Sequence, residues 1–319
     1  MKAAVYYENG PPEVFRFEDV PDPVCAPSGL VIRVEAVSIE GGDTLNRAGG
    51  ALASRPHVVG YQAAGEVIEV GAEVKGFGVG DEVVTVHVFG SHAEKRAVPA
   101  RNAWRIPAGA NLREAAAVPI PFGTADDCLF EFGRLARGET VLVQAGASGV
   151  GLAAIQLAKR AGATVIATAS SPEKLERLRP FGMDHGVDYR TQDLVAEVKR
   201  LTGGRGVNLV VDPVGSTLPQ SLACLAYRGR VSLVGRAGRG ATSVDAAVLM
   251  QGNQSITGVF LGAEILTDRV HDTIQRHLDD VAKGALKVAL DRTFPLREAA
   301  AAHRYIESRA AFGRVLLIP

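Results

Sequence analysis

The small residues at positions 146–151 are the part of the chain best suited to chemistry. An apolar strand pattern at 141–144 leads into them, and a helical pattern at 149–161 follows. The first turn of a helix has free amide donors and the positive end of the helix dipole, so it binds phosphate well. We predict a dinucleotide-binding loop made of Gly146, Ala147, Ser148, Gly149, Val150 and Gly151.

One residue of this loop departs from the usual Gly-x-Gly-x-x-Gly spacing. Ser148 stands at the second glycine position. Its hydroxyl can bond the pyrophosphate, or its bulk can displace the pyrophosphate, and both alternatives stay open. A tight strand–helix turn without a ligand is the alternative for the whole segment. The strand before it and the alternating strands and helices after it favour the dinucleotide.

The end of the second strand of this unit bears on which dinucleotide binds. NAD-preferring domains place an Asp or Glu about 20 residues past the loop, where it accepts a hydrogen bond from the ribose 2′-hydroxyl. Here the strand ends at Ser170 and Ser171, Lys174 follows, and Tyr189 and Arg190 end the third strand. Small neutral residues with nearby cations suit a 2′-phosphate and favour NADPH. The alternative is that Lys174 and Arg190 are solvated surface charges.

Composition narrows the class of protein. The chain has 319 residues, 47% of them apolar, with 35 basic and 35 acidic residues. A net charge of zero argues against nucleic acid or an anionic membrane as a main partner. The N-terminus lacks the apolar core of a signal peptide, and no apolar run approaches the ~20 residues that span a bilayer. We expect a soluble, cytoplasmic protein.

Cysteine and histidine spacing indicates no metal site. Cys25, Cys128 and Cys224 are far apart, and none belongs to a Cys-x-x-Cys pair. A disulfide framework and a cysteine-based zinc site are therefore not expected. The seven histidines show no metal-binding spacing, and we assign none of them a catalytic role.

The elements that position these residues fall into two kinds. Short apolar runs separated by Gly and Pro fill the first hundred residues and predict a partly open β-barrel. From 122 to 260 strands alternate with helices, which predicts a doubly wound parallel sheet of six strands. We predict an α/β protein with a catalytic domain at 1–121 and 261–319 and a nucleotide-binding domain at 122–260.

The individual elements follow from the same patterns. We expect a helix at 267–283, a β-like stretch at 288–290, a helix at 296–307, and a last strand at 315–318 that rejoins the first domain. The expected strands of the nucleotide-binding domain lie at 141–144, 164–167, 186–188, 208–211, 230–234 and 255–259. Its expected helices lie at 149–161, 172–181, 194–201 and 218–226.

Four motifs follow one another along the chain: Gly60-Tyr61-Gln62-Ala63-Ala64-Gly65-Glu66-Val67, Gly78-Val79-Gly80-Asp81-Glu82-Val83, residues 145–151, and Glu307-Ser308-Arg309-Ala310. Together they resemble the medium-chain dehydrogenase/reductase superfamily, in particular its zinc-free quinone oxidoreductase (zeta-crystallin-like) branch. The resemblance implies a GroES-like catalytic domain built from both chain ends, a Rossmann domain between them, and NADPH in the cleft.

The resemblance also indicates that zinc is absent. Zinc-dependent members bind the metal through a Cys, the His of a Gly-His-Glu motif and a third ligand. The matching positions here hold Glu40, Tyr61 with Gln62, and Ile120. Phenol and aliphatic side chains are poor zinc ligands, Glu40 alone cannot hold the metal, and the four-cysteine structural zinc lobe is missing. We predict no bound metal.

The resemblance supplies further candidate site residues. Glu40 stands where quinone reductases usually carry the Asn of an Asn-x-x-Asp motif, and Asp43 matches the Asp, so both are predicted in the substrate pocket. Tyr61 is predicted to face the nicotinamide and donate a hydrogen bond to the substrate oxygen; a packed tyrosine is the equal alternative. Thr124 matches a threonine near the nicotinamide ribose.

The remaining predicted contacts with the cofactor lie in three places. By the same resemblance Lys174, Tyr189 and Arg309 contact the 2′-phosphate, beside Ser170 and Ser171. The loop at 235–240 ends at the carboxyl edge of the sheet, where ligands bind. We predict cofactor contacts there for Gly235 and Arg236; an exposed loop without contacts is the alternative.

These observations predict an NADPH:quinone oxidoreductase that transfers hydride without zinc. One alternative is NADPH-dependent reduction of the C=C bond of α,β-unsaturated carbonyls (alkenals, enones or enoyl thioesters). A second is a non-catalytic NADPH-binding protein. The last strand of the Rossmann sheet, around 254–260, lies at an open edge that must be covered. Pairing with a second copy is the family's usual solution, so we predict a homodimer.

Overall fold

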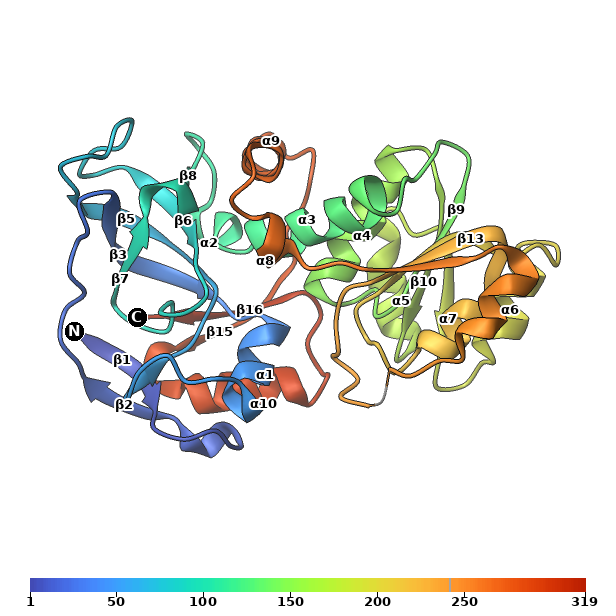
Figure 1. Ribbon diagram of the computed structural model, residues 1–319, viewed down its shortest axis with the longest axis horizontal. Coiled ribbons are helices and arrows are strands. Elements are labelled where there is room, and N and C mark those ends of the chain that lie inside the picture. Colours follow the sequence, from blue (N-terminus) through green and yellow to red (C-terminus); the bar gives the residue numbers. More distant parts are fainter. Residues whose placement is uncertain (241) are drawn as a thin grey trace. The chain divides into compact units, whose positions relative to one another are not determined.

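The computed structural model describes residues 1–240 and 242–319. Contacts divide the chain into two compact units (Figure 1): unit 1 comprises Met1–Ile120 and Ile265–Pro319, and unit 2 comprises Pro121–Glu264. The predicted nucleotide-binding domain, 122–260, falls inside unit 2. Among the described residues, no helix is both long enough and apolar enough to cross a membrane.

Unit 1 is built on a seven-stranded sheet and a small second sheet. The strands of the large sheet are β3 (Gly29–Ser38), β5 (Gln62–Val70), β6 (Glu82–Val86), β7 (Lys95–Pro99), β8 (Ala103–Arg105), β15 (Leu290–Pro295) and β16 (Arg314–Ile318). They run in the order β15-β16-β3-β5-β6-β8, and β7 pairs with β3. The small sheet has the order β2-β1-β4, formed by β1 (Lys2–Tyr6), β2 (Arg16–Asp19) and β4 (His57–Val58). β16 pairs antiparallel with β3, so the chain returns to the first domain as predicted.

The helices of unit 1 differ in part from the prediction. They are α1 (Gly41–Gly49), α2 (Leu112–Ala115), α9 (Asp268–Ala282) and α10 (Ala299–Glu307), with the 3-10 turns η1 (Pro12–Val14), η2 (Ala100–Asn102) and η6 (Leu296–Glu298). α1 was not predicted, because glycines at both ends hide its helical pattern. The expected β-like stretch at 288–290 is wrong for its first two residues, since β15 begins at Leu290.

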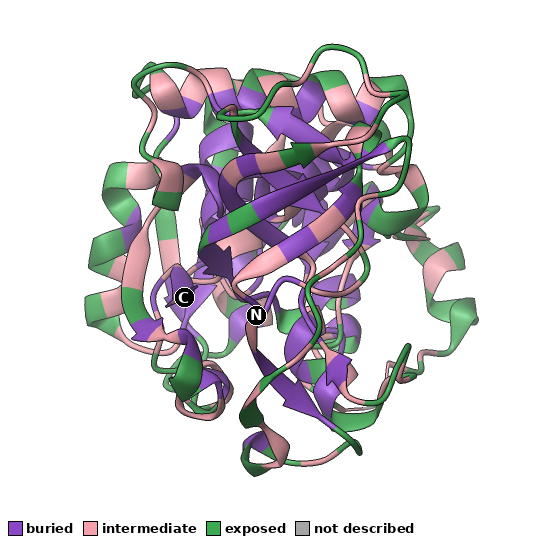
Figure 2. Ribbon diagram, turned by 90° about the vertical axis from the view of Figure 1, so that its left-hand side faces the viewer, coloured by how far each residue is buried: buried purple, intermediate pink, exposed green. Residues whose placement is uncertain are grey.

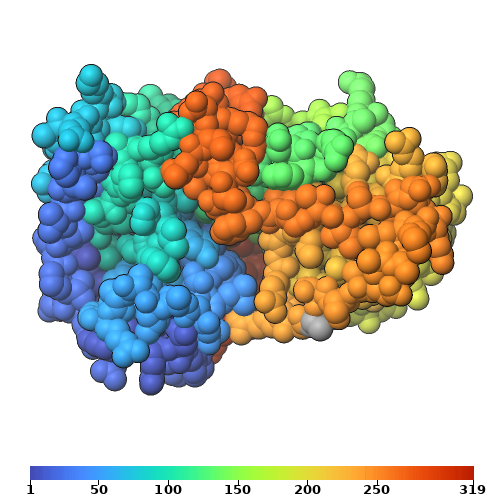
Figure 3. Space-filling view, in the orientation of Figure 1, coloured from blue at the N-terminus to red at the C-terminus, as the bar shows by residue number. Residues whose placement is uncertain are grey.

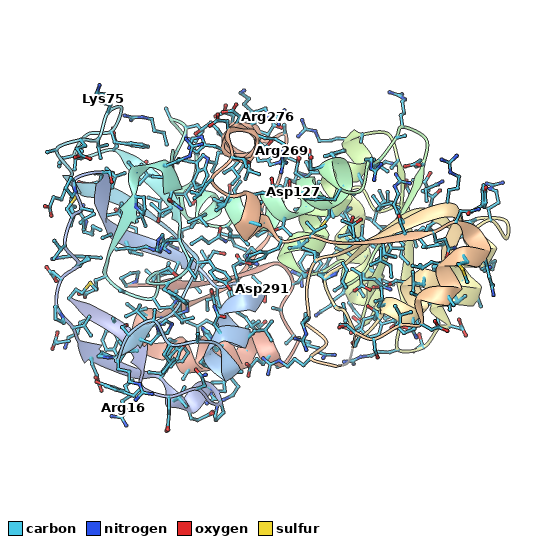
Figure 4. All side chains as sticks on the ribbon, in the orientation of Figure 1. Arg16, Lys75, Asp127, Arg269, Arg276 and Asp291 are labelled. Atoms are coloured by element: carbon cyan, nitrogen blue, oxygen red, sulfur yellow. The ribbon has the colours of Figure 1, made fainter. Side chains whose placement is uncertain are left out.

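Helix α10 packs against the large sheet of unit 1 and hydrogen-bonds to one of its strands. Its residue Ala302 shares a core cluster with Ile32 and Leu317 of the large sheet. Tyr305 donates a hydrogen bond of 2.8 Å to Asp291 on β15, and Asp291 is labelled in Figure 4. The buried residues of unit 1 follow its strands, whereas its outer loops are exposed (Figure 2). α10 therefore connects the chain's C-terminal segment to the sheet through both apolar and polar contacts.

Unit 2 contains the predicted parallel sheet. Its strands are β9 (Thr140–Val143), β10 (Thr164–Ala169), β11 (His185–Asp188), β12 (Val207–Asp212), β13 (Leu225–Leu233) and β14 (Ser255–Gly258). All neighbours are parallel, in the order β11-β10-β9-β12-β13-β14. The order reverses between β9 and β12, and ligands bind doubly wound sheets at the carboxyl ends of such strands.

Helices cover both faces of this sheet. The helices of unit 2 are α3 (Pro119–Asp126, which begins in unit 1), α4 (Gly149–Arg160), α5 (Pro172–Leu178), α6 (Leu194–Leu201), α7 (Leu218–Ala223) and α8 (Leu261–Glu264), with the π-helix η3 (Asp127–Glu131) and the 3-10 helices η4 (Arg179–Phe181) and η5 (Ala246–Gly252). α6 and α7 share a core cluster with Leu142 of β9. Alternation along the strand turns Val141 and Val143 to the other face, where α4 packs. The predicted helix at 218–226 ends early, because Leu225 enters β13.

Two buried histidines join α10 to the segment before β7. Nε2 of His92 and Nε2 of His303 lie 3.0 Å apart, and neither residue is exposed. Burial, with Arg96 nearby, lowers the pKa of His92 to about 3. Burial, with His92 and Arg47 nearby, lowers the pKa of His303 well below its usual value. The ring of Phe15 packs against both imidazoles, which are therefore neutral in the folded protein.

Acid should destabilise unit 1 through this pair. An unfolded histidine takes up a proton below its ordinary pKa of about 6.5, whereas these two stay neutral while folded. Their stabilisation is complete above pH 6.5 and is lost as the pH falls towards 3, by about 1.4 kcal/mol per pH unit for each histidine. Urea unfolding at pH 6.5 and 5.5, followed by the fluorescence of the buried Trp104, measures the pH dependence of the parent protein. Glu40 and Asp43, whose pKa values burial raises to about 8 and about 7, contribute to it with the opposite sign, so a histidine variant is needed to isolate this loss.

Between pH 6.5 and 5.5, His303→Leu should lose about 1 kcal/mol less stability than the parent protein, because one of the two neutral imidazoles is gone. His185→Gln is the matched control, since His185 is an exposed histidine of unit 2. An unchanged pH dependence in His303→Leu would contradict this interpretation.

Candidate functional site

The carboxyl end of β9 leads into the predicted dinucleotide-binding loop. Ala145 has a left-handed backbone, with φ +49°. Its N–H donates to Oγ1 of Thr168 at 3.0 Å, and the N–H of Gly146 donates to the carbonyl of Thr168 at 2.8 Å. Thr168 lies on the adjacent strand β10, so β10 holds the first two amides of the loop.

Three amides at the start of α4 are left for a ligand. Within residues 1–240 and 242–319, the N–H groups of Ala147, Gly149 and Val150 donate to no protein acceptor. The first turn of α4 contains no acidic residue. Free amides and the positive end of a helix dipole together make an anion site.

Ser148 is the N-cap of α4. Its hydroxyl accepts a hydrogen bond from the N–H of Gly151 at 3.1 Å. At Gly151 a Cβ would collide with the carbonyl oxygen of Ala145 and would lie 2.8 Å from Cα of Gly146. Glycine is therefore required for the close packing of α4 against the loop. In this capping bond the oxygen of Ser148 is the acceptor, so its hydroxyl proton can still be donated to a ligand.

The predicted 2′-phosphate contacts lie at the ends of β10 and β11. Ser171 is the N-cap of α5 and accepts from the N–H of Lys174 at 3.3 Å. The N–H of Tyr189 donates to the carbonyl of Ala169, which brings the two strand ends together. Sequence reasoning overlooked one acid here: the hydroxyl of Ser171 bonds the Glu173 side chain and lowers its pKa.

The other predicted cofactor residues are more widely distributed. Thr124 lies on α3 and is 6% exposed. Gly235 packs against the loop after β12, where a Cβ would lie 2.5 Å from the carbonyl oxygen of Pro213, and Arg236 follows it. Residue 241 lies outside the described residues. Arg309 belongs to unit 1, so its contact with a cofactor stays a prediction.

The residues matched to zinc-ligand positions bond to one another in unit 1. The Glu40 side chain is nearly buried, and its Oε1 accepts from Nε2 of Gln62 and from Nη2 of Arg314. Oε1 of Gln62 accepts from the N–H of Ile120 at 3.0 Å. Burial, opposed by Arg314, raises the pKa of Glu40 to about 8. The side chains of Glu40 and Gln62 are therefore hydrogen-bonded within the protein.

Helix α1 positions Tyr61. Its hydroxyl accepts from Nδ2 of Asn46 at 3.0 Å, and its ring lies against Gly42, where a Cβ would collide with it. Burial, with Asp43 nearby, raises the pKa of Tyr61, so the phenol keeps its proton and can donate it in a hydrogen bond. Asp43 is fully buried, and its Oδ2 accepts from the N–H of Glu40 at 2.8 Å, which caps α1.

The donor set of this cluster does not fit zinc. An amide, a phenol and an aliphatic side chain stand beside one carboxyl group that already bonds to Arg314. In the part of the chain that the structure describes, no group of three or more His, Cys, Asp or Glu side chains is placed to hold a metal ion.

Comparison with known proteins identifies the family. The alcohol dehydrogenase GroES-like domain matches residues 26–108, and the zinc-binding dehydrogenase domain matches residues 149–279. A quinone oxidoreductase of Pseudomonas aeruginosa is 33% identical over 97% of this chain and 97% of its own. The chain is a medium-chain dehydrogenase/reductase.

Two further members of this superfamily are similar over their whole length. A 2-haloacrylate reductase of a Burkholderia species is 34% identical over 100% of this chain and 99% of its own. The solved structure of Escherichia coli quinone oxidoreductase complexed with NADPH has a TM-score of 0.94 and 32% identity, and covers 100% of both chains. The medium-chain reductase fold predicted from the sequence, a GroES-like domain with a six-stranded Rossmann sheet, is confirmed.

Sequence reasoning missed two hydrogen-bond partners of the predicted site residues. Arg314 is 274 residues from Glu40, and its only sequence signal is a lone arginine at the start of an apolar strand. Nothing in the sequence indicated that Asn46 contacts Tyr61, because the helix α1 that places Asn46 there was not predicted.

Removing the cap at Ser148 should destabilise unit 2. Ser148→Ala leaves the N–H of Gly151 without its acceptor and should lower the free energy of unfolding by about 1 kcal/mol. Ser148→Asn restores an acceptor at the same position and should stay close to the parent protein. Urea unfolding followed by circular dichroism compares the three. Equal stability of the alanine and asparagine variants would show that the cap contributes nothing.

Proposed function

We propose that this protein is an NADPH-dependent oxidoreductase that reduces quinones by hydride transfer without zinc. The observation that carries the proposal is the set of three free amides at the start of α4, on Ala147, Gly149 and Val150. The names of the similar proteins, quinone oxidoreductase and 2-haloacrylate reductase, support the class of reaction. The NADPH complex of the similar Escherichia coli enzyme supports the cofactor.

The cofactor would be held by residues at the start of α4 and at the carboxyl ends of β10 and β11. In the proposal the free amides of α4 bind the pyrophosphate. Ser170, Ser171, Lys174 and Tyr189 surround the 2′-phosphate. Bound NADPH supplies the hydride. The full set of proposed cofactor residues also includes Thr124, Gly146, Ser148, Gly151, Gly235, Arg236 and Arg309.

Tyr61 is the proposed hydrogen-bond donor to the acceptor. Asn46 donates to the phenol oxygen and leaves the phenol proton to point elsewhere. A donor aimed at the acceptor oxygen stabilises the negative charge that develops there. A quinone is already electrophilic, so it needs no Lewis acid to accept hydride. Glu40 and Asp43 are proposed to shape the pocket from behind, since both already accept internal hydrogen bonds.

Reduction of a C=C bond is the second candidate. The similarity to a 2-haloacrylate reductase favours it. The products separate the two reactions: a hydroquinone from a quinone, or a saturated product with its carbonyl intact from an enone. Tight NADPH binding without turnover of any acceptor would instead support a non-catalytic nucleotide-binding protein.

The enzyme should oxidise NADPH faster than NADH in the presence of a quinone. Lys174→Ala should reduce this preference by about tenfold, the loss expected for one charge-assisted hydrogen bond to the 2′-phosphate. Initial rates at 340 nm, over a panel of quinones and enones, measure the preference.

Lys199→Ala is the control, because Lys199 is an exposed lysine of the same unit. A strong chelator should leave the rates unchanged. Equal use of NADH and NADPH would refute the cofactor, and loss of activity with the chelator that zinc restores would refute the zinc-free reaction.

We also propose that the protein is a homodimer through β14. Among the described residues this strand pairs only with β13, so one edge is open. The segment at 245–260, orange in Figure 3, lies on the surface of unit 2. Tyr227, Met250 and Phe260 are 69%, 74% and 73% exposed. An open edge flanked by exposed apolar side chains favours pairing with a second copy.

Sedimentation equilibrium at micromolar concentration should give the mass of two chains. Phe260→Asp should shift the protein towards the monomer, because a charge would be buried in the interface. Val24→Asp changes an even more exposed apolar residue, in unit 1, and should stay dimeric. A monomeric parent protein would rule out the dimer.

A further inference from the structure

A chain of buried polar side chains runs beneath the dinucleotide-binding loop of unit 2. It begins at Asp212, at the end of β12, and passes through Ser221 on α7 and Gln144 at the end of β9. It ends at Thr168 on β10. Each of these residues is at most 2% exposed. The chain therefore crosses the carboxyl edge of the sheet at the point where the strand order reverses.

Every hydrogen bond in this chain points towards Asp212. The N–H of Ala145 donates to the hydroxyl of Thr168 at 3.0 Å, and that hydroxyl donates to Oε1 of Gln144 at 3.0 Å. Nε2 of Gln144 donates to the hydroxyl of Ser221 at 3.2 Å, and that hydroxyl donates to Oδ2 of Asp212 at 2.8 Å. An amide N–H can only donate and a carboxylate can only accept, so the two ends fix the direction of the chain.

Asp212 is anchored independently of the loop. Its Oδ1 accepts from the N–H groups of Val214 and Gly215 at 2.9 and 3.0 Å, and from the hydroxyl of Thr217 at 2.9 Å. The parts of the chain that the structure describes supply it with no basic partner. A buried carboxyl group without a basic partner is stable only when its hydrogen bonds are made, and these donors supply them.

The other end of the chain controls which loop amides are free. Thr168 takes the N–H of Ala145 with its hydroxyl and the N–H of Gly146 with its carbonyl. These bonds hold Ala145 in its left-handed conformation, which alanine rarely adopts. The next amides, on Ala147 and Gly149, are then left without acceptors.

We propose that the Asp212–Ser221–Gln144–Thr168 chain positions the loop amides that bind the pyrophosphate. This inference rests on the proposed NADPH binding. The four side chains act through the backbone of the loop and do not touch the cofactor. NADPH and NADH share the pyrophosphate, so the chain contributes equally to the binding of both.

The sharpest test compares Thr168→Val with Thr168→Ser in the full-length protein. Valine has the shape of threonine but neither accepts from Ala145 nor donates to Gln144, whereas serine keeps the hydroxyl. Thr168→Val should raise the dissociation constants of both NADPH and NADH about tenfold, equivalent to about 1.4 kcal/mol. Thr168→Ser should stay within about twofold of the parent protein, and the ratio of the two constants should not change in either variant. Nicotinamide fluorescence titrations measure these constants.

Thr202→Val is the matched control for general destabilisation. Thr202 is also a buried threonine of unit 2; its hydroxyl accepts from the N–H of Gly206 at 2.9 Å and donates to the carbonyl of Val198 at 2.7 Å. It lies at the end of α6, outside the chain to Asp212. Thr202→Val should lose stability as Thr168→Val does, and should keep its affinity for both nucleotides.

The outcomes are distinguishable. A parent protein that binds neither nucleotide refutes the proposed function itself. With binding established, equal affinities of Thr168→Val and Thr168→Ser overturn the inference. So does a loss confined to NADPH, or an equal loss in Thr202→Val. If Thr168→Val does not fold, Ser221→Ala breaks the same chain at another link and should weaken both nucleotides in parallel.

Discussion

At the carboxyl edge of the sheet of unit 2, each backbone N–H group that follows a strand needs a hydrogen-bond acceptor, either in the protein or in a ligand. Thr168 takes two of these amides and Ser148 takes that of Gly151. The proposed activity depends on what is left over: a short run of amides, free because their neighbours are satisfied. The sheet matters to this arrangement because it brings β9, β10 and β12 side by side, so that residues distant in sequence share one edge.

In unit 1 a backbone amide is likewise satisfied by a buried side-chain network. Gln62 accepts the N–H of Ile120 with its oxygen and donates to Glu40 with its nitrogen, and Arg314 donates to the same oxygen of Glu40. In both units a glutamine links a backbone amide, directly or through a hydroxyl, to a buried acid. Buried polar networks of this kind stabilise only when every member is satisfied. A residue change in either network therefore acts on the backbone as well as on the side chain that is changed.

The sequence was sufficient for the elements whose signal is local. The loop around Gly146 and the parallel sheet after it follow from glycine placement and strand–helix alternation. α1 was missed because its glycines are poor helix formers, and its stability comes from the capping box of Glu40 and Asp43. Arg314 could not be paired from sequence, because only the fold brings β16 next to β3. Elements with a local pattern can thus be predicted from the sequence, whereas side-chain partners that only the fold brings together cannot.

The position of β16 also bears on how the chain folds as it is synthesised. Unit 2 is continuous in sequence and is complete at Glu264, whereas β16 inserts between β15 and β3. The end of β3 at Val37 and Ser38 must therefore wait for its β16 partner until residues 314–318 leave the ribosome. The nucleotide-binding unit can be folded by then. Unit 1, whose first strands are synthesised before unit 2, is therefore completed after it.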